Sequence, residues 1–219
     1  MRFLVINLVI ISIASWSHAF SFDGWQPGYP IDTVCRIGEQ RSLLYLYTTD
    51  GGLGRASVME STKRKNKRLN CEKLGKVEKV YYEKALGDKP YKITLEFTPR
   101  SKLLRKITLY WKDFSWNRMV MERSYDEAYV DQVVSILQKR YGKPTQEEIS
   151  GGLMKNFSAV WNLEGIEILT VKATHNTITI TYENNQVEAI YEAEQKRIQA
   201  EKAIRKQIEY ELQEKAFLR

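Results

Sequence analysis

Residues 91–111 read YKITLEFTPRSKLLRKITLYW, and they give the clearest indication of the fold class. Ile93, Leu95 and Phe97 alternate with polar residues, and residues 103–111 repeat the same alternation. Alternation of apolar and polar residues is typical of a strand with one buried face. Residues 99–102, between the two runs, have the composition of a turn. The stretch therefore predicts a β-hairpin with one face against a core.

Strand-like runs flank this hairpin, and one helix interrupts them. The expected strands cover residues 42–49, 55–59 and 77–84 before it and residues 156–163, 166–173 and 177–182 after it. Residues 125–141 instead repeat apolar positions at three- and four-residue steps, with Ser124 or Asp126 as the cap and Gly142 and Pro144 as the stop. Residues 20–34 look like an irregular lead-in. The predicted fold class is α+β: an antiparallel sheet with a packed helix, a β-β-α-β-β-β core, within one domain over residues 20–185.

Residues 186–219 predict one long helix, because the segment is rich in charge and contains neither Gly nor Pro. At about 1.5 Å per residue the helix is about 50 Å long, more than this domain can cover. The stripe of apolar residues on it is less regular than a coiled-coil repeat, although a coiled coil is one form that its contacts could take. We expect the first half to pack on the sheet and the remainder to project. The expected partner-binding residues are Ile198, Ile204, Ile208 and Leu212.

The first 19 residues have the pattern of a secretory signal peptide. Arg2 supplies the positive start, residues 3–14 are almost continuously apolar, and Ser17 and Ala19 are small residues at the two positions that a signal peptidase reads. We therefore expect cleavage after Ala19. The alternative is a membrane anchor, but a spanning helix needs about 20 apolar residues and this run is shorter. No later segment is long enough to span a membrane, so the mature protein is expected to be periplasmic or secreted.

Cys35 and Cys71 are the only two cysteines of the chain. Export would place them in an oxidising compartment, where a pair of cysteines forms a disulfide. Such a bridge is worth about 2–4 kcal/mol. Two free or catalytic thiols are the alternative, although the pair lacks the Cys-x-x-Cys spacing of a thioredoxin-like redox site.

A short basic run carries much of the excess positive charge. The chain has 34 Lys and Arg against 27 Asp and Glu, a formal net charge of +7. The run is made of Lys63, Arg64, Lys65, Lys67 and Arg68. It could contact anionic lipid or an acidic partner. Nucleic acid is a poor candidate, because no stacked-aromatic motif accompanies the run. A solvated loop is the plainest interpretation.

The sequence lacks the residue patterns that most catalytic and metal sites require. After removal of the leader the only histidine is His175, in an expected turn, and the chain lacks the His-Glu-x-x-His, Cys-x-x-Cys and calcium-loop spacings of metal sites. The Gly-x-Ser-x-Gly nucleophile motif is also missing. We therefore expect no metal, no cofactor and no catalytic residue. A secreted hydrolase that uses two carboxylates brought together by the fold stays open as an alternative.

Several short motifs together resemble small exported α+β proteins of Gram-negative bacteria. They are residues 28–34 (GYPIDTV) followed by Cys35, the hairpin of residues 93–111, the helix end at 137–144 (LQKRYGKP), Trp161, and the strands 166–173 and 177–182. The layout of residues 28–182 is similar to the BamE/SmpA-type fold and to β-lactamase-inhibitor-like modules. The resemblance implies a binding domain without catalytic residues. The chain departs from the lipoproteins of this group because no cysteine follows the apolar leader, and its long C-terminal helix is an addition.

Together these features predict an exported, non-catalytic binding or adaptor protein of the cell envelope. The expected partner is another envelope protein, which the C-terminal helix would contact while the basic run adds electrostatic steering. A secreted effector that acts on a host through the basic run is a second alternative. Because a fold does not by itself imply a function, the choice depends on the surface that the structure presents.

Overall fold

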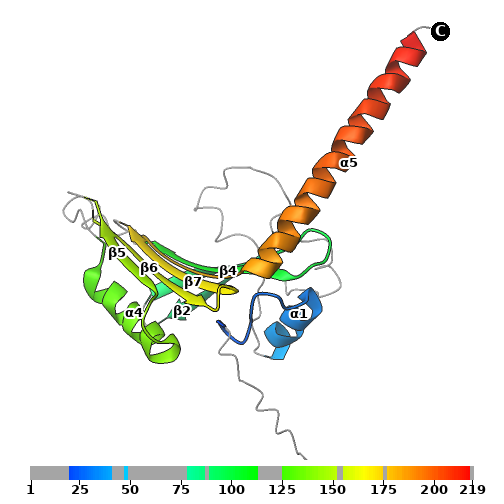
Figure 1. The fold of residues 1–219 in the computed structure, drawn as a ribbon. Coiled ribbons are helices and arrows are strands. Elements are labelled where there is room, and N and C mark those ends of the chain that lie inside the picture. Colours follow the sequence, from blue (N-terminus) through cyan, green and yellow to red (C-terminus); the bar gives the residue numbers. More distant parts are fainter. Residues whose placement is uncertain are drawn as a thin grey trace, which may run out of the picture.

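The computed structural model describes residues 20–40, 47–48, 78–86, 89–112, 125–151, 155–174 and 177–217. In chain order the elements are α1 (Ile31–Gln40), β1 (Tyr47–Thr48), β2 (Lys79–Leu86), β3 (Lys89–Phe97), β4 (Leu104–Lys112), α4 (Glu127–Tyr141), β5 (Gln146–Ser150), β6 (Asn156–Leu163), β7 (Glu167–Thr174), β8 (Thr177–Asn184) and α5 (Asn185–Phe217). The α+β prediction, with its antiparallel sheet, packed helix and long C-terminal helix, is confirmed (Figure 1).

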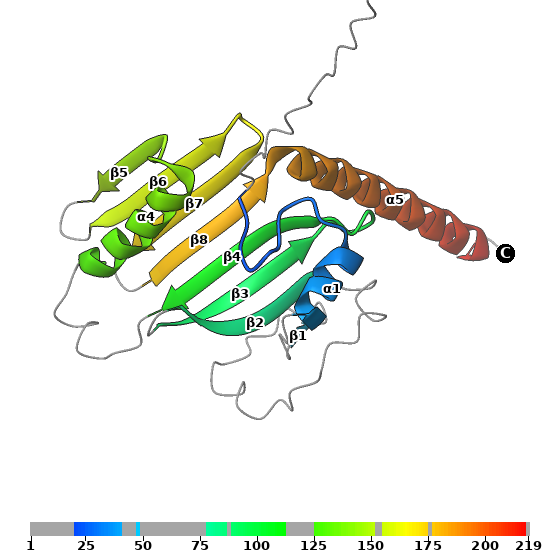
Figure 2. The same ribbon diagram turned by 90° about the horizontal axis from the view of Figure 1, so that it is seen from below.

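One antiparallel sheet of eight strands runs through the molecule, in the order β1-β2-β3-β4-β8-β7-β6-β5. The strands that precede α4 meet the strands that follow it at the β4–β8 pair, where Ile107 lies opposite Tyr182 and Leu109 opposite Ile180. In chain order, α1 precedes the first half of the sheet (β1 to β4), and α4 precedes the second half (β5 to β8). Figure 2 shows both helices on the same face of the sheet, one over each half. The core lies between this face and the helices.

The hairpin of β3 and β4 supplies the centre of the core, as its alternation predicts. Ile93, Leu95 and Phe97 are at most 2% exposed, and so are Ile107 and Leu109 on the paired strand. Their neighbours in sequence lie on the opposite face of the sheet, because successive side chains of a strand alternate between faces. The apolar–polar period therefore determined which side of the hairpin is buried.

The opposite face of the sheet is covered by neither α1 nor α4, and threonine dominates its centre. Thr94, Thr108, Thr181 and Thr170 stand side by side on β3, β4, β8 and β7 in one cross-strand row. Threonine suits this place, since its branched side chain packs well on a pleated surface while its hydroxyl stays hydrated. Lys106 and Glu183 form an ion pair across β4 and β8 on the same face. The centre of this face is therefore polar, and its side chains pair across neighbouring strands.

The ends of α4 confirm the expected cap and stop signals. Asp126 is the N-cap, and its side chain accepts a hydrogen bond from the Tyr129 N–H at 3.2 Å. Gly142 ends the helix with a positive φ of 81°, which glycine adopts without strain because it has no Cβ. The indole N–H of Trp161 donates to the Gly142 carbonyl at 2.8 Å and so ties β6 to the end of the helix.

The prediction of an irregular lead-in over residues 20–34 is wrong in part, because α1 begins at Ile31. A helix of ten residues has little stability of its own, and packing of its buried side chains supplies what its short pattern does not show. The preceding residues are packed too: Trp25 is fully buried, and its indole N–H donates to the Val34 carbonyl at 3.0 Å. Figure 2 shows this segment lying across the sheet between the two helices.

The strand β5 was not predicted either. All five of its side chains are exposed, and its sequence QEEIS shows no alternation. It pairs only with β6 and forms the edge of the sheet. Charged residues on an exposed edge strand hinder pairing with other chains, so such a strand carries no apolar pattern that sequence reasoning could detect.

Several sequence predictions lie outside the described residues. These are the leader (1–19), most of the expected hairpin over 42–59, the basic run of Lys63, Arg64, Lys65, Lys67 and Arg68, and the turn at His175. Cys35 is buried in α1, and no free cysteine occurs in the described part of the chain. Cys71 lies outside that part, so the Cys35–Cys71 disulfide stays a prediction.

Candidate interaction surface: the projecting helix

The helix α5 continues directly from the sheet. The strand β8 ends at Asn184 and the helix starts at Asn185, one residue before the predicted boundary. The Asn184 side-chain oxygen accepts hydrogen bonds from the N–H groups of Gln186 (2.9 Å) and Val187 (3.3 Å), which caps the first turn. The helix is 33 residues long and therefore about 50 Å from end to end. Figure 1 shows it projecting away from the sheet, with the C-terminus at its far end.

The first turns of α5 are anchored on β4 and on the N-terminal segment. Val187 is 5% exposed, and a Cβ placed on Gly28 would come within 3.7 Å of it. On the next residue the Glu188 carboxylate lies 2.8 Å from Arg105 Nε of β4. The Arg105 guanidinium stacks over the Tyr191 ring at 3.9 Å from its centroid. These contacts fix the direction in which the helix leaves the sheet.

Glu194 makes the second anchor, on the turn between β3 and β4. It is 8% exposed, and its two carboxylate oxygens accept hydrogen bonds from the backbone N–H of Arg100 (2.7 Å) and of Ser101 (3.0 Å). Burial alone would raise the pKa of the Glu194 carboxyl, but the hydrogen bonds from these two residues and the charge of Arg100 outweigh burial and lower it. Further along the helix, Glu201 forms an exposed ion pair with the Arg100 guanidinium. The sequence shows Glu194 only as a break in the apolar stripe, and this break was the signal for an anchor.

The Glu194 anchor is expected to weaken in acid. A carboxylate whose pKa is lowered by folding stabilises the folded state fully above about pH 4.3, the ordinary Glu value, and loses that contribution as the pH falls through the lowered pKa. The difference in unfolding free energy between the native chain and Glu194→Gln should therefore be largest near neutral pH and shrink in acid. Urea denaturation between neutral pH and about pH 3 measures it. A difference that stays constant over this range would contradict the prediction.

Beyond the anchors and the Glu201 ion pair, α5 forms a free arm, which we define as residues 202–217. Every side chain described there is exposed. Ile204, Ile208 and Leu212 are 60%, 51% and 61% exposed, and their four-residue spacing places them on one face of the helix. We call these three residues the arm stripe. The fourth residue predicted to bind a partner, Ile198, is half-buried next to the anchored turns and does not belong to it.

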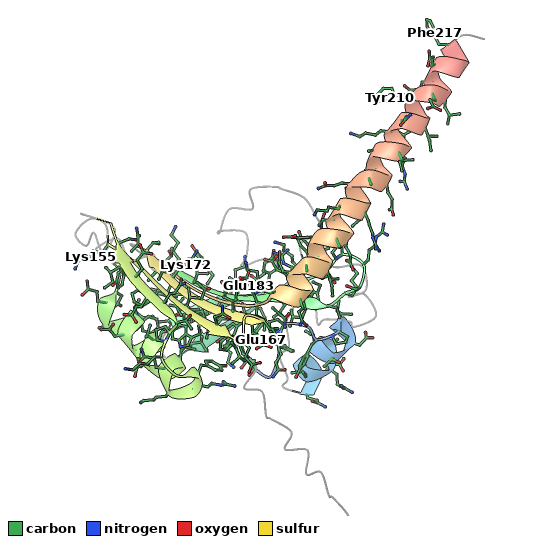
Figure 3. All side chains as sticks on the ribbon, viewed as in Figure 1. Lys155, Glu167, Lys172, Glu183, Tyr210 and Phe217 are labelled. Carbon is green, nitrogen blue, oxygen red and sulfur yellow. The ribbon has the colours of Figure 1, made fainter. Side chains whose placement is uncertain are left out.

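The far side of the arm also carries exposed rings. Tyr210 is 72% exposed and Phe217 is 91% exposed, and Figure 3 labels both near the tip of the helix. Tyr210 follows Ile208 by two residues, which at about 100° per residue places it on the opposite side of the helix. The arm therefore has one stripe of aligned aliphatic side chains and a separate pair of aromatic ones.

Charge on the arm changes sign along its length. Lys202, Arg205 and Lys206 lie nearer the sheet, and Glu209, Glu211 and Glu214 lie nearer the tip, where Gln207 also donates to Glu211 at 3.3 Å. Opposite charges on a partner surface would have to follow the reverse order. The arm stripe lies along this gradient, so apolar contact and charge would together fix how a partner binds.

Two carboxylates among the described residues, those of Glu167 and Glu194, have shifted pKa values, and both accept hydrogen bonds from backbone N–H groups of the fold. Within the described ranges, no group of three or more His, Cys, Asp or Glu side chains is placed to hold a metal ion. The absence of enzymatic activity stays a prediction.

Among the helices in the described part of the chain, none is both long and apolar enough to cross a membrane. Comparison of the chain with protein-family models, with characterised proteins and with solved structures found no match to any of them. The resemblance to BamE/SmpA-like and β-lactamase-inhibitor-like modules therefore stays a prediction from the sequence.

Proposed function

We propose that this protein is an exported, non-catalytic binding protein of the cell envelope, and that the free arm of α5 is the element that binds another envelope protein. The observation that carries the proposal is the exposure of three aligned aliphatic side chains, Ile204, Ile208 and Leu212, on a helix that its own domain does not cover. Helices that insert an apolar stripe into a groove of a partner use residues with this spacing.

The arm is a stable part of the molecule because of its anchors. Forming the first turn is the costly step in helix formation, and the arm continues a helix whose first turns are already fixed by Val187, Glu188 and Glu194. A partner would therefore meet a preformed helix and would lose little free energy in ordering it. This favours a role in binding over a role as a loose tail.

The order of charges along the arm indicates which charges a complementary partner surface would carry. A complementary groove has an apolar floor, acidic side chains opposite Lys202, Arg205 and Lys206, and basic side chains opposite the glutamates near the tip. The location in the envelope rests on the leader pattern of residues 1–19. The basic run of residues 63–68 would add steering toward anionic lipid or an acidic partner.

The substitution Ile208→Asp is expected to weaken partner binding about tenfold or more, because a contact that buries an unpaired charge loses more than about 1.4 kcal/mol. The partner would be captured by crosslinking in the native cells, purified, and titrated with the full-length protein. Tyr210→Asp is the matched control, since it introduces the same charge on the opposite side of the same helix turn. It should leave the affinity within about twofold.

Three results would overturn the proposal. One is equal binding by the native chain and a chain that ends at Glu201, which keeps both anchors and loses the arm. Another is equal weakening by Ile208→Asp and Tyr210→Asp. The third is capture of a second copy of this chain alone, which would make the arm an element of self-association.

A further inference from the structure

The first residue of the expected mature chain occupies a specific place in the fold. The Phe20 backbone nitrogen lies 2.6 Å from Oε2 of Glu167, the first residue of β7. The Phe20 ring is 3% exposed and meets the edge of the Tyr141 ring, with the centroids 4.8 Å apart and the planes at 88°. Figure 3 shows Glu167 at the end of the sheet from which α5 rises.

The next residue is held equally closely. The Ser21 N–H donates to the Tyr141 hydroxyl at 3.2 Å, and that hydroxyl donates to the Ser21 carbonyl at 3.1 Å. The Arg140 guanidinium donates to the Ser21 hydroxyl at 2.8 Å. The last turn of α4 and the start of β7 therefore form a built site for residues 20 and 21.

A single amide N–H is a weak partner for the Glu167 carboxylate. Glu167 is half-buried, and burial raises the pKa of its carboxyl while the hydrogen bond from Phe20 lowers it only in part. A half-buried carboxylate is stabilised far better by a positive charge than by one neutral donor. The electrostatics of the site therefore favour a cation at the position of the Phe20 nitrogen.

We infer that removal of residues 1–19 creates this cation, and that the new α-ammonium group of Phe20 forms an ion pair with Glu167 that locks the mature N-terminus onto the fold. A signal peptidase hydrolyses the Ala19–Phe20 peptide bond: water supplies the hydroxyl that completes the Ala19 carboxylate, and the Phe20 nitrogen leaves as an amine that is protonated at neutral pH. The inference rests on the export that the proposed function includes. In the uncleaved chain the Phe20 nitrogen is a neutral amide, which donates a hydrogen bond to Glu167.

The consequence is a fold that becomes more stable when it is processed. The contacts with Tyr141 and Glu167 join the N-terminal segment to α4 and β7. The same segment contains Trp25, which is buried in the core, and Gly28, which lies next to Val187 at the base of α5. Cleavage would thus stabilise the sheet and the segments packed on it in the compartment to which the protein is exported. Before cleavage the chain would open more readily.

The test compares two purified chains, one that begins at Phe20 and one that begins one residue earlier at Ala19, each with native Glu167 and with Glu167→Gln. The unfolding equilibrium constant at neutral pH should be about fivefold lower for the Phe20 chain, the upper end of the effect of solvent-accessible ion pairs. Glu167→Gln should remove the difference between the two chains. Glu164→Gln, at an exposed turn residue three positions earlier, is the control and should preserve it.

A second readout separates the ion pair from packing alone. The α-amine of the Phe20 chain should react slowly with an acylating reagent, and Glu167→Gln should speed its modification at that residue. Equal stability of the two native-Glu167 chains would overturn the lock, and so would an N-terminus other than Phe20 on protein recovered from the cells. Neither result bears on binding by the arm, so failure of the lock and failure of the proposed function can be told apart.

Discussion

Replacement of Trp161 by alanine is expected to lower the free energy of unfolding by about 3–5 kcal/mol. Trp161 is 2% exposed on β6, and its indole N–H donates to the Gly142 carbonyl at the end of α4. The change therefore leaves a cavity beneath α4 and an acceptor without its donor. Urea denaturation followed by circular dichroism measures the loss.

The variant Trp161→Phe separates the two contributions. Phenylalanine fills most of the indole volume but cannot donate to Gly142, so we expect it to cost about 1–2 kcal/mol. A cost below about 1 kcal/mol for Trp161→Ala would mean that α4 can close over the site, and would contradict a tightly packed indole between β6 and α4.

Replacement of Glu194 by alanine is expected to cost about 2–3 kcal/mol and to loosen the arm. The two backbone N–H groups of the β3–β4 turn lose their charged acceptor. A hydrogen bond to a charged group contributes about 1.5–3 kcal/mol to stability, and water that takes the place of the carboxylate recovers part of the loss. The exposed residue Glu192 provides a matched control, since Glu192→Ala removes the same charge from the same helix. It should change stability by no more than about 0.5 kcal/mol.

The arm itself supplies a second measurement for Glu194. Spin labels placed on β2 and near the tip of α5 should give one narrow distance distribution in the native chain and in Glu192→Ala. In Glu194→Ala the distribution should broaden, because one of the two anchors is lost. A narrow distribution in all three proteins would show that the contacts of Val187 and Arg105 hold the arm without Glu194.

Local pattern was enough to predict most of the regular structure. The strand β6 has the predicted bounds, 156–163, and α4 ends at the predicted glycine, because alternation, helical spacing and stop signals are short-range properties. The two elements that escaped prediction, α1 and β5, are short. The first gains its stability from packing, and the second is exposed on both faces.

The candidate surface was predicted in part. Ile204, Ile208 and Leu212 are the exposed residues that the helical pattern indicates, whereas Ile198 lies against the anchored base. Neither Glu194 nor Glu167 was predicted to be an anchor. Glu194 shows in the sequence only as a break in the apolar stripe, and Glu167, one of 27 Asp and Glu, carries no signal of its own. Their roles depend on backbone N–H groups that are 93 to 147 positions away in the chain.

Residue order alone is enough to predict the fold class, the buried face of the central hairpin, the long C-terminal helix and the stripe that it carries. These follow from periodicity, which depends only on residues a few positions apart. Long-range packing instead sets the pairing of β4 with β8, the point where the helix leaves the sheet, and the carboxylates that hold the N-terminal segment and the arm. Those contacts close long loops of chain, and packing among side chains distant in sequence selects one closure out of many that local patterns would allow.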